Sequence, residues 1–159
     1  MKPILKGAIF ALLTSAALST SALAAGFDVN VTTTDLALRG FDPVSYFTGD
    51  APVEGMTDIT AVHDGAIYRF ANADNKAMFE ADPAKYAPQY GGYCAFGAAQ
   101  GYKFDGDPAV WKIVDDKLYL NLSPKVSEIW QQDVPGNIEN ANMKWTEIEN
   151  VDPSELAPQ

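Results

Sequence analysis

Two short aspartate-containing turns constrain the fold of this chain more than any other feature. Asp64-Gly65 divides residues 59–70, and Asp115-Asp116 divides residues 109–122, and both segments are rich in β-branched and aromatic residues. A two-residue type I′ turn needs positive φ at its central residues, which Gly accepts and Asp tolerates. The sequence therefore predicts two antiparallel hairpins.

The first turn also predicts a register for its hairpin, because residues at equal distances from the turn face each other. The expected pairs are His63 with Ala66, Ala61 with Tyr68 and Ile59 with Phe70 on one face, and Val62 with Ile67 and Thr60 with Arg69 on the other. Apolar residues occur on both faces, so the pattern does not identify the core side.

Helices are predicted between and after the hairpins. They cover residues 73–81, capped by Asn72 or Asp74; residues 93–100; residues 124–132, capped by Ser123 with Pro124 at the first position; and a final segment from Pro135 to near Trp145. The expected fold is α+β: a small antiparallel sheet built from hairpins, with short helices packed on it. No internal repeat is evident at the periods of solenoid proteins.

The first 24 residues have the pattern of a removable signal peptide. Lys2 and Lys6 precede an apolar run over residues 7–17, and Ala22-Leu23-Ala24 offers a small-x-small cleavage site. The run falls short of the ~20 residues needed to span a bilayer, although an uncleaved anchor is the alternative. We therefore expect a periplasmic or secreted protein.

Cleavage after Ala24 leaves three expected segments: an extended lead-in (residues 25–38), a domain with a C-terminal helical extension (residues 39–146) and a flexible acidic tail (residues 147–159). The formal charge of the whole chain is −10, and loss of Lys2 and Lys6 makes it −12. Such a surface repels phosphate backbones and anionic lipid heads, which disfavours nucleic-acid binding. No later stretch is apolar enough to form a membrane span.

Several short motifs occur in a characteristic order along the chain. They are Asp42-Pro43-Val44, Asp64-Gly65-x-x-Tyr68-x-Phe70, Phe79 with Asp82-Pro83 and Tyr86, and Tyr90-Gly91-Gly92-Tyr93-Cys94. In this order the chain resembles the YHS domain family, and specifically an exported bacterial subgroup of YHS proteins. The resemblance covers residues 40–130, which is most of the processed chain.

The resemblance implies an association with metals, copper especially, because the domain also occurs in copper-transporting ATPases. Usual members carry one cysteine after the Asp-Pro-Val motif and one after the hairpin phenylalanine. Ser45 and Ala71 stand at those positions here. Neither is a soft-metal ligand, so the standard thiol site of the family is absent.

Three other residues are therefore the candidate metal ligands, for a site that favours copper. Cys94 is the only cysteine and His63 the only histidine, while Met56 offers a thioether. If Cys94 and His63 form a site, their sulfur and nitrogen should lie within about 4 Å of each other. The alternatives are a buried, inert cysteine and a histidine that merely flanks a turn.

A second hypothesis is a metal-free module that binds a small molecule or a protein partner. The segment 86–104 combines aromatic rings with glycines, and Tyr90, Tyr93, Phe96 and Tyr102 are its candidate pocket-lining residues. The alternative is that these rings form the core of a small domain. A third hypothesis, a thiol-dependent enzyme or redox-sensitive protein, would use Cys94 and requires an exposed, reactive thiol. No P-loop, nucleophile elbow or dinucleotide-binding motif is present, so binding is favoured over catalysis.

Overall fold

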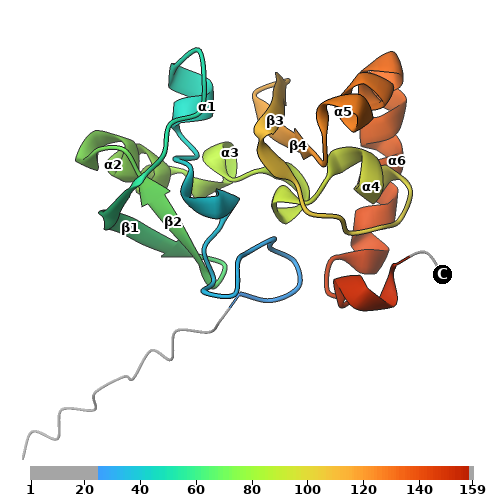
Figure 1. The fold of residues 1–159 in the computed structure, drawn as a ribbon, viewed down its shortest axis with the longest axis horizontal. Helices are drawn as coiled ribbons and strands as arrows, with labels where there is room; N and C mark the ends of the chain where they lie inside the picture. Colours follow the sequence, from blue (N-terminus) through green and yellow to red (C-terminus); the bar gives the residue numbers. More distant parts are fainter. Residues whose placement is uncertain (1–24, 158–159) are drawn as a thin grey trace, which may run out of the picture.

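The computed structural model describes residues 25–157, and it has the expected α+β architecture, with two separate two-stranded antiparallel sheets (Figure 1). The predicted signal peptide lies outside the described residues. The strands are β1 (Met56–His63), β2 (Ala66–Phe70), β3 (Asp107–Val114) and β4 (Lys117–Asn121). The α-helices are α1 (Ser45–Thr48), α2 (Ala73–Ala81), α3 (Pro83–Tyr86), α4 (Ala95–Ala99), α5 (Pro124–Trp130) and α6 (Val134–Ile148). Short 3₁₀ helices are η1 (Leu38–Gly40), η2 (Gln89–Gly92), η3 (Gln131–Asp133) and η4 (Pro153–Glu155).

Both predicted hairpins are present, and their turns have the expected left-handed backbone. The φ angles are 49° and 74° at Asp64 and Gly65, and 49° and 57° at Asp115 and Asp116. The register matches from the turn as far as Thr60 with Arg69, but the pairing of Ile59 with Phe70 is wrong. Phe70 pairs with Met56 instead, because β1 contains an irregularity between Met56 and Thr60.

The helix caps follow the sequence pattern. The side chain of Asn72 accepts the N–H of Asn75 at the start of α2, and Ser123 accepts the N–H of Val126 at the start of α5. These bonds satisfy backbone donors that a helix start leaves without partners. Helix α4 begins two residues later than predicted, because the sulfur of Cys94 caps it by accepting the N–H of Gly97.

The chain contains the same structural unit twice, in residues 38–81 (the first half) and residues 90–130 (the second half). Every strand pair of β1–β2, moved by 51 positions, gives a strand pair of β3–β4, irregularity included: Met56 with Phe70 becomes Asp107 with Asn121. The capping residues Asn72 and Ser123 differ by the same offset.

The segments before the hairpins correspond as well, with an offset of 52. Each half has three consecutive left-handed residues: Leu38, Arg39 and Gly40 have φ of 50°, 50° and 90°, and Tyr90, Gly91 and Gly92 have φ of 53°, 59° and 87°. Two residues further on, the N–H of Asp42 donates to Val53 and the N–H of Cys94 to Phe104, both at 2.8 Å. Asp42 and Cys94 are therefore counterparts in the two halves.

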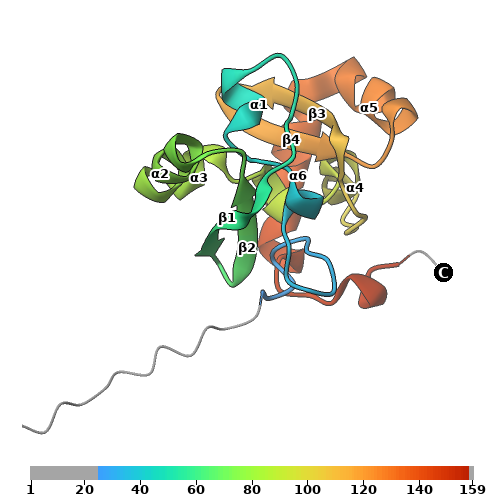
Figure 2. The ribbon, with the colours of Figure 1, turned by 60° about the vertical axis from the view of Figure 1, so that its left-hand side comes forward.

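The two halves lie side by side and share contacts across their seam (Figure 1). Helix α1 of the first half packs on the hairpin of the second, where Tyr46 donates a 2.9 Å hydrogen bond to the carbonyl of Pro108. The ring of Tyr46 also meets Trp111 edge-on at 5.4 Å, and Figure 2 shows α1 beside β3 and β4. Helix α6 has no counterpart in the first half, and it covers α4.

Lys103 joins both ends of the described chain to the second half. This buried ammonium donates to the carbonyls of Phe27, Glu149 and Val151 at 2.8, 2.6 and 2.9 Å, and it lies over the rings of Tyr93 and Trp145. Burial lowers the pKa of Lys103. A hydrogen bond from the N–H of Asn30 to the carbonyl of Gly91 places the lead-in against η2. Within residues 25–157, no helix combines the length and the apolar character that crossing a bilayer requires.

Candidate functional site

Asp42 forms the centre of a buried polar network in the first half. Its side chain is fully buried, and its carboxylate accepts the N–H of Val44 at 2.8 Å, the N–H of Ala71 at 2.8 Å and the amide of Asn75 at 2.6 Å. Three donors offset the desolvation of this carboxylate. The network ties the Asp-Pro-Val motif to the end of β2 and to α2.

The two positions at which the YHS resemblance implies cysteines both contact Asp42. Ser45 donates from its hydroxyl to the Asp42 carbonyl at 2.6 Å and accepts the N–H of Val53 at 3.0 Å. Ala71 donates its N–H to the Asp42 carboxylate. Ser45 and Ala71 thus belong to one hydrogen-bonded network centred on Asp42.

Cys94 holds the corresponding place in the second half. Its side chain is 1% exposed, and its sulfur lies 3.4 Å from the N–H of Gly97 and 3.6 Å from the side-chain oxygen of Asn121. Burial raises the pKa of the Cys94 thiol, although backbone N–H groups, including that of Leu122, act in the opposite direction. A buried, protonated thiol is a poor nucleophile and a poor metal ligand.

His63 and Met56 both lie on β1, in the first half. The His63 ring packs edge-on against Phe79 at 5.8 Å, and its Nε2 lies 3.2 Å from the carboxylate of Asp64. Met56 is 49% exposed at the other end of the strand. The structure therefore does not gather Cys94, His63 and Met56, and over residues 25–157 no three His, Cys, Asp or Glu side chains are arranged to hold a metal ion.

The aromatic candidates belong mainly to the core of the second half. Tyr90 and Tyr93 are buried, and both rings pack against Trp145. Tyr90 donates to the side chain of Asn142 at 3.0 Å, while burial raises the pKa of Tyr90 and raises that of Tyr93 to about 12. Phe96 and Tyr102 are partly exposed, and the Tyr102 ring lies 5.6 Å from that of Phe104.

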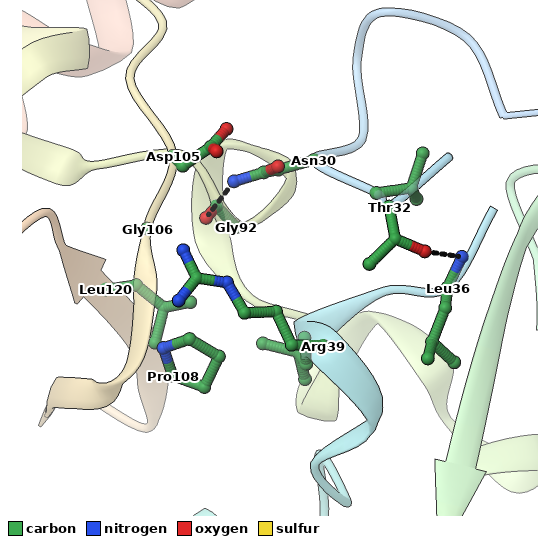
Figure 3. Close-up of a pocket in the computed structure, with 11 residues that line it drawn as sticks. Asn30, Thr32, Leu36, Arg39, Gly92, Asp105, Gly106, Pro108 and Leu120 are labelled. Atoms are coloured by element: carbon green, nitrogen blue, oxygen red, sulfur yellow. Dashed lines mark hydrogen bonds between the residues drawn. The ribbon is translucent and has the colours of Figure 1, made fainter. Parts of the chain in front are cut away.

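A cavity of about 90 Å³ opens instead at the seam between the halves (Figure 3). We call it the seam cavity. Its lining comprises Asn30, Val31, Thr32, Leu36, Leu38 and Arg39 from the lead-in and η1, and Gly92, Asp105, Gly106, Pro108 and Leu120 from the second half. None of the four aromatic candidates is among them.

Arg39 places the positive charge of the seam cavity. Its guanidinium reaches across the cavity, with Asn30, Gly92 and Asp105 on one side and Pro108 and Leu120 on the other (Figure 3). Among the described residues, the Arg39 side chain has no hydrogen-bond or ion-pair partner. Its backbone is left-handed, a conformation that disfavours residues with a Cβ atom.

The lead-in forms one wall of the cavity and is fixed to η2. The backbone N–H of Asn30 donates to the Gly91 carbonyl at 2.9 Å, and its side-chain amide donates to the Gly92 carbonyl at 3.3 Å. A Cβ atom at position 91 would collide with the backbone oxygen of Asp28. Gly91 is therefore required for the lead-in to lie this close.

Asp105 supplies the negative charge of the cavity wall. Its backbone bridges to Tyr93, while its exposed carboxylate has neither a hydrogen bond nor an ion pair within residues 25–157. Arg39 and Asp105 thus face one cavity without pairing with each other. The cavity combines two unpaired opposite charges with walls that are partly polar and partly apolar.

Sequence reasoning missed Asn30, Arg39 and Asp105 because 75 positions separate the first from the last. The available signal was the correspondence of Arg39-Gly40-Phe41 with Gly91-Gly92-Tyr93, which marks Arg39 as a charged residue at a glycine-like position. No family model, curated protein or solved structure matches this chain. The site is therefore interpreted from its own geometry.

Proposed function

We propose that this protein is an exported, YHS-like binding module that holds a small carboxylate-bearing molecule in the seam cavity, without a metal. The observation that carries the proposal is the guanidinium of Arg39, an exposed residue whose side chain has no hydrogen-bond or ion-pair partner among residues 25–157 and is directed into a cavity with polar and apolar walls. A guanidinium is planar and presents paired N–H donors that match the two oxygens of a carboxylate.

The size of the cavity limits the ligand. Typical ligand pockets measure about 300–1,000 Å³, whereas the seam cavity measures about 90 Å³. A molecule of a few heavy atoms fits, or the end group of a larger molecule. Leu36, Leu38 and Leu120 contribute apolar wall, which suits a short aliphatic portion beside the carboxylate.

The backbone of Arg39 supports a functional role for its side chain. A left-handed residue with a Cβ atom costs roughly 1–2 kcal/mol relative to its usual conformation. The second half has Gly91 at the corresponding position, where this cost disappears. Strained backbone positions cluster at ligand-binding sites; the left-handed backbone is shared by Leu38, which also lines the cavity, and by Tyr90 in the core.

The family assignment and the export belong to the same proposal. The meeting of Ser45 and Ala71 at Asp42 supports the YHS resemblance, because the family's paired cysteines require those positions to be close. The buried Cys94 thiol favours binding over catalysis. Copper binding through Cys94 remains a separate prediction, which anaerobic Cu(I) titration of the protein and of Cys94→Ala would test.

The direct test is a titration of the purified protein with acetate and propionate, followed through the backbone amide signals of Gly92 and Gly106 by NMR. We expect saturable shifts with a dissociation constant on the order of 1 mM, since so small a ligand makes few contacts. Arg39→Gly should abolish the shifts, and Arg39→Lys should weaken them.

The matched control is Arg69→Gln, because Arg69 is the only other arginine and does not line the cavity. This variant should bind like the unmodified protein. Shifts that persist in Arg39→Gly, or that are lost equally in Arg69→Gln, would contradict the proposal.

A further inference from the structure

The polar groups of the seam cavity are divided by type between two sides. Arg39 is purely a donor. Asp105 is purely an acceptor. Asn30 uses its side-chain amide nitrogen to donate to the Gly92 carbonyl, and its side-chain oxygen, an acceptor, has no hydrogen-bond partner in the described structure. Asp105 and Asn30 lie together on one side of the guanidinium (Figure 3). The cavity is therefore basic on one wall and rich in acceptors on another.

We infer that the ligand is a small α-amino acid, with its carboxylate on Arg39 and its ammonium on Asp105 and Asn30. This inference rests on the proposed function and identifies the class of carboxylate. A simple carboxylate satisfies Arg39 but brings a second negative charge towards Asp105, which is unfavourable at short range. An amino acid places an ammonium there, and its three N–H donors match the acceptors present.

The surface charge of the protein favours the same class. The chain carries a net charge of −10, which repels free anions at long range. A zwitterion has no net charge and does not meet this repulsion. The small volume and the walls formed by Leu36, Leu38, Pro108 and Leu120 admit a side chain of glycine or alanine size.

The duplicated architecture supplies a control for Asp105. Glu54 is its counterpart: Glu54 bridges to Phe41 in the first half as Asp105 bridges to Tyr93 in the second. Glu54 is also exposed, but it does not line the seam cavity. Removing either carboxylate changes the net charge equally, so a difference between the two variants reports the local contact alone.

The experiment compares alanine with propionate, which differ only in the ammonium group, on the protein, Asp105→Asn and Glu54→Gln. We expect alanine to bind roughly three- to tenfold more tightly than propionate, as for one partly exposed ion pair with supporting hydrogen bonds. Asp105→Asn should remove this preference. Glu54→Gln should keep it.

The outcomes separate the inference from the proposal on which it rests. Arg39-dependent propionate binding without any preference for alanine would overturn the amino-acid inference and leave the carboxylate site standing. A preference for alanine that survives Asp105→Asn would also overturn it, because the ammonium would lie elsewhere. If neither compound binds, the carboxylate site fails, and the inference fails with it.

Discussion

The two halves of this molecule have one backbone plan but different residues at its centre. In the first half, the Asp42 carboxylate accepts three donors and is fully satisfied. In the second, Cys94 takes the same place. The N–H of Phe96, the counterpart of Val44, donates to the side-chain oxygen of Asn121 instead of to the residue at the centre. The buried Asn121 amide nitrogen is left without a partner in the described structure. The same backbone thus tolerates a charged centre and a nearly apolar one, provided that nearby backbone N–H groups find acceptors.

The largest expected effect on the free energy of unfolding comes from replacing Asp42 and Cys94, one at a time, by alanine. Asp42→Ala leaves one buried donor, on Val44, and two partly buried donors, on Ala71 and Asn75, without an acceptor, so it should lower the free energy of unfolding by about 3–5 kcal/mol. Cys94→Ala removes one buried sulfur and its weak bonds, which should cost roughly 1–2 kcal/mol. Urea denaturation of both variants measures the difference. Equal losses would show that the two centres are energetically equivalent despite their chemistry.

The second largest effect concerns the contact between the lead-in and Gly91 of η2. The counterpart of Gly91 in the first half, Arg39, makes no such contact. Gly91→Ala places a Cβ atom against the Asp28 backbone at a residue with φ of 59°. We expect a loss of about 1–3 kcal/mol and faster hydrogen exchange at Asn30. Gly49→Ala, where a Cβ meets only ordinary contacts, is the control. Unchanged exchange at Asn30 would contradict the close packing described here.

The sequence predicted most local features of both halves. Turn residues and capping residues act through neighbouring backbone groups, so the hairpins and the caps of α2 and α5 could be predicted from short segments. The irregularity in β1 could not, since no residue between Met56 and Thr60 carries a distinctive signal. The sequence does not predict the duplication, because backbone geometry is preserved between the halves while residues differ, as Asp42 and Cys94 illustrate.

The candidate site was harder to predict than the fold. Cys94 and His63 are the only residues of their types in the sequence, and Met56 offers a thioether, but residue type says nothing about proximity in the fold. Tyr90 and Tyr93 are buried in the core, which was the alternative considered for the rings of segment 86–104. The seam cavity depends on three distant segments that only the pairing of the two halves brings together.

A smaller effect concerns alkaline pH and the buried thiol. Burial raises the pKa of Cys94 above its ordinary value of 9.0, so the folded state keeps a proton that the unfolded chain releases. The stabilising contribution of the protonated thiol is present below pH 9 and is lost as the pH rises above it. Unfolding free energies of the protein and Cys94→Ala should therefore converge as the pH rises above 9. Burial also raises the pKa of five tyrosines, and all five are present in both proteins, so the difference between the proteins isolates Cys94; they are Tyr46, Tyr68, Tyr90, Tyr93 and Tyr119. A constant difference would show that the thiol has the same pKa in both states.

The smallest effect on stability, and the sharpest comparison of the halves, is expected for Arg39→Gly. This substitution gives η1 the residue that η2 has at the same place, Gly91. Relief of left-handed strain should stabilise the fold by roughly 1–2 kcal/mol, and the entropy of the added glycine should offset about 0.5–1 kcal/mol of that. We therefore expect a gain of about 0–1.5 kcal/mol in urea denaturation, together with the loss of carboxylate binding. Arg39→Ala keeps the strain and removes the guanidinium, so it should lose binding without gaining stability. If Arg39→Gly instead destabilises the protein clearly, the arginine serves the fold, and the strain at this position is no sign of a ligand.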